Sequence, residues 1–144
     1  MLEGPFFLGS DHAGFALKNF LRDQLIALGL EVEDCGPHSA ESCDYPETAR
    51  RVCELVLDRK GYGILVCGTG IGMSIAANKV KGIRAACCTD CYSAKMTREH
   101  NDANILCLGG RVLGVGTALM LADVFLDTPF CGEERHKRRI AQME

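Results

Sequence analysis

The sequence predicts an α/β protein: a single three-layer α/β/α domain with a five-stranded parallel sheet, of the Rossmann-like kind. Short apolar segments alternate with segments whose apolar residues follow helical spacing, which is the pattern of β-α-β units. Glycine-rich and polar clusters follow the apolar segments along the chain. At 144 residues the chain has a common length for one domain.

The expected strands are short, and most are apolar runs, as strands buried on both faces of a sheet should be, whereas residues 30–35 alternate between apolar and polar. In chain order they are 5–10, 30–35, 62–67, 83–88 and 104–109. Each expected helix carries one apolar face, and Gly29 suits the end of the first. The helices lie at about 15–28, 49–56, 71–79, 92–100 and 115–126, and a charged helical tail covers about 130–144.

Composition and charge exclude several classes of protein. A net charge of −3 argues against a general nucleic-acid binder, and no apolar run approaches the ~20 residues that a membrane span needs. The N-terminus shows no signal peptide. The nine cysteines are odd in number and scattered, and several lie in apolar runs, which favours free structural thiols over disulfides or a metal site. We therefore expect a cytoplasmic protein with reduced thiols that binds neither nucleic acid nor a membrane.

The stretch CGTGIG, residues 67–72, is the first candidate site. Gly68, Gly70 and Gly72 allow successive amide N–H groups to point at one anion, and the helix that follows adds its positive end. The spacing fits neither the dinucleotide fingerprint nor the P-loop. Cys67 beside these amides can act as a thiolate base or nucleophile. The alternative is a tight strand-to-helix turn, with Cys67 at the end of a buried strand.

Two further clusters carry acid/base or anion-binding side chains. His100 and Asn101 lie where a helix should end and the last strand begin. Beside a thiol-lined nest this imidazole would be an acid/base group, and the alternative is a helix C-cap. Arg135 and Arg139 share one helix face and, with Arg111 after a double glycine, suit an anionic substrate. The alternative for the tail is a solvated face.

Polar residues that follow the strands should converge on one edge of the sheet. Asp11 and His12 follow the first strand, and Tyr45 ends the loop after the second. In open parallel sheets, ligands bind beyond the carboxyl ends of the strands. We therefore expect these residues to lie with residues 67–72 and Arg111 around one cleft. The alternative for Asp11 is a helix N-cap, and both roles can coexist.

Seven motifs, in order and nearly from end to end, resemble the ribose/galactose isomerase family, which includes ribose-5-phosphate isomerase B and the galactose-6-phosphate isomerase subunits. They are GSDHAGFALK (9–18), DYP (44–46), CGTGIGMSIAANK (67–79), GIRAA (82–86), REHNDAN (98–104), GGRVLG (109–114) and RHKRR (135–139). The resemblance implies isomerisation of ribose 5-phosphate to ribulose 5-phosphate through a cis-enediolate, without a cofactor. One branch of the family has a glutamate at the position of Met73, so Cys67 points to the thiol branch.

The resemblance also implies a role for each matched residue. Cys67 is the base that takes the C2 proton, Thr69 assists proton transfer at the substrate oxygens, and His100 opens the sugar ring. Asp11 is a polar helper in that step. The substrate-binding positions are the backbone of Gly68, Gly70, Ile71 and Gly72 at the enediolate, Asn101 at the sugar oxygens, Tyr45 of the DYP motif, and His12, Arg111, Arg135 and Arg139 at the phosphate.

The family further implies a homodimer, which can pair into a tetramer, with the tail on a neighbouring subunit and the active site at the interface. A six-carbon substrate such as allose 6-phosphate or galactose 6-phosphate stays open, as does a non-catalytic sugar-phosphate-binding domain. The complete set of matched residues favours the pentose enzyme, and Cys67 with His100 favours catalysis. A thiol redox or metal protein rests only on the number of cysteines and ranks last.

Overall fold

The computed structural model describes residues 1–144 and contains one sheet of five parallel strands. β1 is Phe6–Ser10, β2 is Val32–Asp34, β3 is Tyr62–Cys67, β4 is Ala85–Cys87 and β5 is Ile105–Gly109. Their order across the sheet is β2-β1-β3-β5-β4, and every neighbouring pair is parallel. The predicted five-stranded parallel sheet is confirmed.

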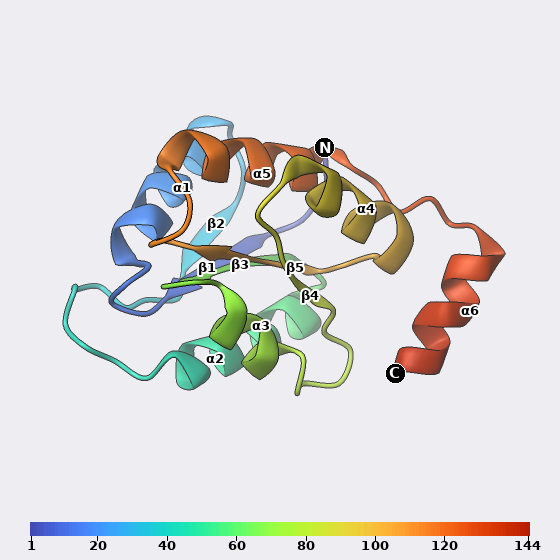
Figure 1. Ribbon diagram of the computed structural model, residues 1–144, viewed down its shortest axis with the longest axis horizontal. Coiled ribbons are helices and arrows are strands. Elements are labelled where there is room, and N and C mark those ends of the chain that lie inside the picture. Colours follow the sequence, from blue (N-terminus) through green and yellow to red (C-terminus); the bar gives the residue numbers. More distant parts are fainter.

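Helices cover both faces of the sheet, as the alternating pattern predicts (Figure 1). The helices are α1 (Phe15–Ala27), α2 (Tyr45–Arg59), α3 (Ile71–Ala77), α4 (Cys91–Asn101), α5 (Val115–Asp127) and α6 (Glu134–Met143). α1, α4 and α5 lie on one face, and α2 and α3 lie on the other. α6 stands beside α4, away from the sheet. No helix has both the length and the apolar character that crossing a membrane requires.

The sheet separates two apolar clusters, one under each helical layer. Phe6 and Leu8 of β1 pack with α1, α4 and α5, whereas Phe7 packs with α2 and α3. Successive strand residues point to opposite faces, so a sheet covered on both sides buries every residue of a central strand. All residues of β1 and β5 are buried. This double burial is why the central strands are apolar runs in the sequence, whereas the edge strand β2, with Glu33 and Asp34, is only partly buried.

The edge strand β4 is shorter than the predicted segment 83–88, because side chains replace part of its backbone pairing. The Asn78 amide donates to the Ala85 carbonyl at 2.9 Å and accepts from the Ala85 N–H at 2.8 Å. The Arg84 N–H donates to the Asn104 side chain at 2.9 Å. The loop before β4 is therefore fixed by side-chain amides, and only Ala85–Cys87 forms the ladder with β5.

The charged tail forms a helix only from Glu134, so the predicted range of about 130–144 starts too early. An extended segment precedes it and is anchored to α4, because the Cys131 N–H donates to the Glu99 carbonyl at 3.1 Å. At the other end, the Glu144 carboxylate pairs with Arg84 at 2.7 Å. α6 is thus tethered at both ends while most of its length faces solvent.

Candidate active site

The loop between β3 and α3 holds the predicted thiol. Cys67 is the last residue of β3, and its Sγ accepts a hydrogen bond from the Gly70 N–H at 3.1 Å. Gly70 has φ +81°, a left-handed conformation that favours glycine, and an added Cβ would lie 2.9 Å from the Leu108 carbonyl carbon. Glycine at this position therefore allows the loop to cross the end of β5 and turn its amide toward the sulfur.

Some of the loop amides are used within the loop, and others remain available. The Ile71 N–H donates to the Thr69 hydroxyl at 3.2 Å, and the Gly70 N–H donates to Cys67. The N–H groups of Thr69, Gly72 and Met73 donate to no acceptor in the chain. Free amides at a loop of this kind bind anionic oxygen. The set is narrower than the predicted run from Gly68 to Gly72, because Gly70 and Ile71 already have partners.

Cys67 is almost closed off by its neighbours, with a relative exposure of 5%. It belongs to the α2–α3 cluster, which also contains the fully buried Met73. Its sulfur nevertheless faces the loop, because the bond from Gly70 fixes that direction. The thiol is therefore part of the apolar cluster and also accepts a hydrogen bond from a loop amide.

The carboxyl edge of the sheet brings several predicted residues together. The Asp11 carboxylate accepts from the Gly14 N–H at 3.0 Å, so it also stabilises the turn that leads into α1. The His12 Nδ1 accepts from the Cys43 N–H at 3.4 Å. Both residues follow β1, whose Ser10 pairs with Val66 next to the thiol. β1, which pairs with β3, thus places a carboxylate and an imidazole at the sheet edge that carries Cys67.

Tyr45 and Arg111 border the same loop from its two sides. A Cβ added to Gly72 would lie 2.9 Å from the Tyr45 ring, and one added to Gly68 would lie 3.7 Å from the Arg111 side chain. The Arg111 N–H donates to the Gly68 carbonyl at 3.0 Å, which fixes the two loops to each other. An aromatic ring and a guanidinium therefore stand on either side of the glycine loop.

His100 and Asn101 do not lie beside Cys67 in the same chain, so within one subunit the His100 imidazole is not next to the glycine loop. They end α4, which runs antiparallel to the strands. The Asn101 carbonyl accepts from Arg84, directly before β4, at 2.8 Å. They therefore sit at the amino edge of the sheet, whereas Cys67 is at its carboxyl edge. A strand the length of β5 separates the edges by roughly 13 Å.

His136 is a residue that the sequence reasoning missed. Its ring stacks on that of His100, with centroids 4.3 Å apart and planes 10° apart. His136 is 6% exposed, and its Nε2 has no hydrogen-bond partner. Burial, together with the nearby charge of His100, lowers the pKa of His136. The only signal in the sequence was its place between Arg135 and Arg139 in the motif RHKRR.

Acidification is expected to destabilise the chain through His136. Because its pKa in the folded state lies below the ordinary 6.5, the unfolded chain binds more protons at this group as the pH falls through that value. Stability should therefore be full above about pH 6.5 and decrease below it. Thermal unfolding between pH 8 and pH 5 tests this, and His136→Gln should flatten the profile. The exposed His38→Gln variant is the control, and an equal flattening there would contradict the assignment.

Arg135 and Arg139 lie on α6 and are exposed. The Arg135 Nε pairs with the Glu133 carboxylate at 2.8 Å, whereas Arg139 makes no ion pair within the chain. Cys131, Glu133 and His136 bring potential metal-ligand atoms within 4.8 Å of one another at the start of this helix. Arg139 is exposed and unpaired, which leaves it available to another molecule.

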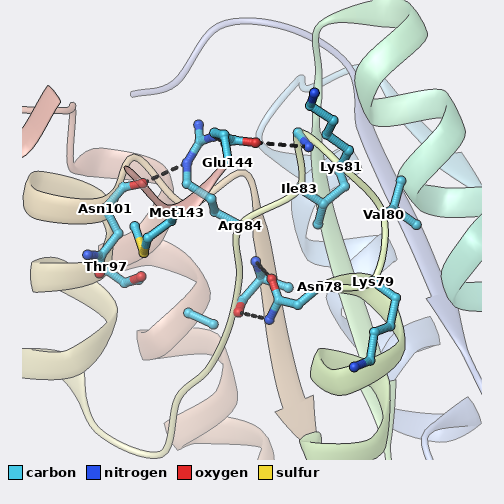
Figure 2. Close-up of a pocket in the computed structure, with 13 residues that line it drawn as sticks. Asn78, Lys79, Val80, Lys81, Ile83, Arg84, Thr97, Asn101, Met143 and Glu144 are labelled. Carbon is cyan, nitrogen blue, oxygen red and sulfur yellow. Dashed lines mark hydrogen bonds and ion pairs between the residues drawn. The ribbon is translucent and has the colours of Figure 1, made fainter. Parts of the chain in front are cut away.

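A cavity of about 610 Å³ lies at the amino edge (Figure 2). Its walls are the loop from Asn78 to Ala86, Thr97 and Asn101 of α4, and Met143 and Glu144 at the end of α6. The side chain of Asn101 makes no hydrogen bond within the chain. A smaller hollow of about 370 Å³ includes Tyr45. Neither hollow includes Cys67, which is buried by its own chain, so neither of these cavities reaches the thiol.

The fold and these residues define a parallel α/β ligand-binding domain with acid/base side chains at both edges of its sheet. Residues 6–143 match the family model described as Ribose/Galactose Isomerase. Ribose-5-phosphate isomerase B of Escherichia coli (strain K12) is 46% identical over 133 residues, which cover 92% of this chain and 89% of that protein. The chain therefore belongs to the ribose/galactose isomerase family, as its motifs predict.

Solved structures agree with this assignment. A ribose-5-phosphate isomerase B from Clostridium thermocellum is 50% identical with a TM-score of 0.94, and the match covers 96% of this chain and 94% of that one. The ribose 5-phosphate isomerase B from Anaplasma phagocytophilum is 48% identical with a TM-score of 0.95, over 100% and 99% of the two chains. The match therefore extends to α6, which stands apart from the sheet.

Proposed function

We propose that this chain interconverts ribose 5-phosphate and ribulose 5-phosphate as an aldose–ketose isomerase, without a cofactor. The relatives at 46% to 50% identity are named for this substrate. The observation that carries the proposal is the Cys67 sulfur held at 3.1 Å from the Gly70 N–H, beside amides that have no acceptor of their own. A base next to donors for a developing oxyanion is what an enediolate mechanism needs.

The proton transfers follow from this arrangement. The Cys67 thiolate removes the C2 proton of the open-chain aldose, and the electron pair moves to the C1 oxygen to form the enediolate. The free amides of Thr69 and Gly72 stabilise that oxygen anion. The Cys67 thiol then returns the proton to C1, while Thr69 relays the proton of the C2 hydroxyl to the C1 oxygen, which leaves a C1 hydroxyl and a C2 carbonyl. No proton or electron is gained or lost overall, so the reaction needs no redox group.

Ring opening requires a second acid/base group, and we assign it to His100 of a partner subunit. His100 and Asn101 sit at the amino edge of their own sheet, so a second copy must place them against Cys67. Their availability supports this, since the His100 ring and the Asn101 amide make no hydrogen bond within the chain. In a two-fold dimer, each subunit would complete the other's site. Asp11 at the carboxyl edge is then the polar helper.

The tail supports the same dimer. α6 stands off the domain and is tethered at its ends, which suits a helix that reaches a neighbouring subunit (Figure 1). Arg135 and Arg139 then join His12 and Arg111 as the grip on the phosphate, because guanidinium groups match phosphate oxygens. Pairing of such dimers into tetramers belongs to the same proposal.

Arg139→Ala is expected to raise KM for ribose 5-phosphate by about tenfold, with a smaller effect on kcat. A charge-assisted bond to phosphate contributes mainly to binding, and losing it costs about 1.5 kcal/mol. Steady-state kinetics measures both constants. Arg138→Ala, an exposed arginine on the adjacent face, is the matched control and should leave KM near wild type. Equal effects of the two substitutions on KM, or no effect of Arg139→Ala, would contradict the phosphate contact and favour a solvent-exposed tail helix without a role in binding.

The substrate is tested by assaying the purified protein on ribose 5-phosphate, allose 6-phosphate and galactose 6-phosphate side by side. We expect the highest kcat/KM on the five-carbon substrate. A higher kcat/KM on a six-carbon sugar phosphate would contradict the proposed substrate but not the proposed isomerisation chemistry. Binding of these sugars without turnover would indicate a non-catalytic domain. A cytoplasmic location is also proposed, and it is supported by nine free cysteines, which a reducing compartment preserves.

A further inference from the structure

Two thiols hold the two ends of one peptide group in the catalytic loop. The peptide between Thr69 and Gly70 donates its N–H to the Cys67 sulfur at 3.1 Å. Its carbonyl accepts from the Cys87 thiol at 3.6 Å, a normal length for a sulfur donor. Cys87 is the last residue of the edge strand β4, so the loop spans the end of β5 to reach it.

The surrounding backbone keeps this peptide in place. A Cβ added to Gly70 would lie 2.9 Å from the Leu108 carbonyl carbon and 3.0 Å from the Cys87 sulfur. One added to Gly109 would lie 2.8 Å from the Thr69 carbonyl group. The loop therefore packs tightly against the end of β5. The Cys87 thiol contacts the loop at this same place. The peptide cannot rotate without losing one of its two sulfur partners.

We propose that Cys87 is a positioning residue for isomerisation, which orients and polarises the Thr69–Gly70 peptide so that its N–H stabilises the Cys67 thiolate. The inference rests on the proposed role of Cys67 as the base. A donor on a peptide carbonyl draws electron density from the nitrogen and strengthens the N–H as a donor in turn. Hydrogen bonds to an ionised group are also stronger than neutral ones. The hydrogen bonds thus form a chain from the Cys87 S–H, through the Thr69–Gly70 peptide, to the Cys67 sulfur.

Cys87 suits the donor role because it keeps its proton. Partial burial and the proximity of Cys67 raise the pKa of Cys87. A thiol that is hard to ionise remains a hydrogen-bond donor, and the hydrogen-bond directions agree with this role for Cys87. Cys87 gives a proton to the loop, and Cys67 accepts one from it.

The first test is the pH profile of kcat/KM for Cys87→Val and Cys87→Ser. Valine fills the space without a donor, so the acid limb of the Cys87→Val profile should move to higher pH by about half a pKa unit. At a pH below the limb, kcat/KM should then be about threefold lower than in wild type. Serine keeps a donor and should restore the profile. Cys88→Ala, the adjacent buried thiol that packs on the opposite face of the sheet, should leave it unchanged. An unshifted limb in Cys87→Val, or a shift that serine does not reverse, overturns the proposal.

The second test reads Cys67 directly and does not depend on turnover. The rate of Cys67 alkylation by iodoacetamide is followed against pH by peptide mass spectrometry, which separates it from the other thiols. The midpoint should be higher in Cys87→Val than in wild type, and restored in Cys87→Ser. An unchanged midpoint overturns the role of Cys87. A shifted midpoint in a protein that isomerises no sugar phosphate would support the coupling of the thiols and contradict the proposed function instead.

Discussion

Cys67→Ala should abolish isomerisation, with kcat for ribose 5-phosphate reduced by about 100-fold or more, while the sugar phosphate still binds. Removing a general base has a cost of this size, and the adjacent Met73 cannot hold a proton. The substitution leaves the free loop amides and Arg111 in place. Coupled-assay kinetics measures the loss of turnover, and calorimetric titration with ribose 5-phosphate measures the retained affinity.

Cys53→Ala is the matched control for Cys67. Cys53 is a fully buried thiol in the same apolar cluster, and burial raises its pKa to about 12, so it is not a base. If kcat falls because the cluster is disturbed, both variants should show it. Turnover near wild type in Cys67→Ala would remove this sulfur from the mechanism.

Lys18→Met should lower the free energy of unfolding by about 3 kcal/mol. The Lys18 ammonium is fully buried and donates to the Asp34 carboxylate at 2.9 Å and to the Pro37 carbonyl at 2.6 Å. Breaking a buried pair leaves one charge without its partner, which costs about 3–5 kcal/mol. We expect the lower end, because Arg22 still pairs with Asp34 at 2.8 Å. Urea unfolding followed by circular dichroism measures the difference.

The control for Lys18→Met is Lys95→Met, which removes an exposed pair with Glu99 at 3.6 Å and should lower the free energy of unfolding by about 1 kcal/mol or less.

The buried cluster of Lys18, Asp34 and Arg22 also makes stability depend on pH. Burial alone would raise the pKa of Asp34, but hydrogen bonds from Lys18, Gly36 and Arg22 outweigh it and lower that pKa. This stabilisation is present above about pH 3.8 and is lost as the pH falls through the depressed value. Equal stability losses in the two lysine variants would contradict the buried pair.

The sheet could be predicted because burial on both faces leaves a direct mark on the sequence, as in PFFLGS and ILCLGG. Buried Lys18 left a weaker mark. It lies three residues before Leu21 and seven before Leu25, on the buried face of α1. A lysine on such a face must find a partner, but no local pattern identifies Asp34 or the Pro37 carbonyl, since they come from the end of β2 and the loop after it.

The separation of His100 from Cys67 illustrates what motif reading leaves out. Both residues match one family, which invites placing them together. A helix between parallel strands returns to the amino edge, however, so a residue at its end lies opposite a residue at a strand end. The stacking of His136 on His100 could not be predicted, because it depends on how an isolated tail helix docks.

A mixed dimer tests the central claim, that Cys67 of one subunit works with His100 of the other. Cys67→Ala and His100→Ala chains carrying different tags are refolded together, and dimers with one chain of each kind are purified through both tags. Each parent variant should be inactive. If the two residues meet across a two-fold interface, the mixed dimer keeps one intact site and should show about half of wild-type activity. A mixed dimer as inactive as its parents would place both residues in one chain's site and contradict the account.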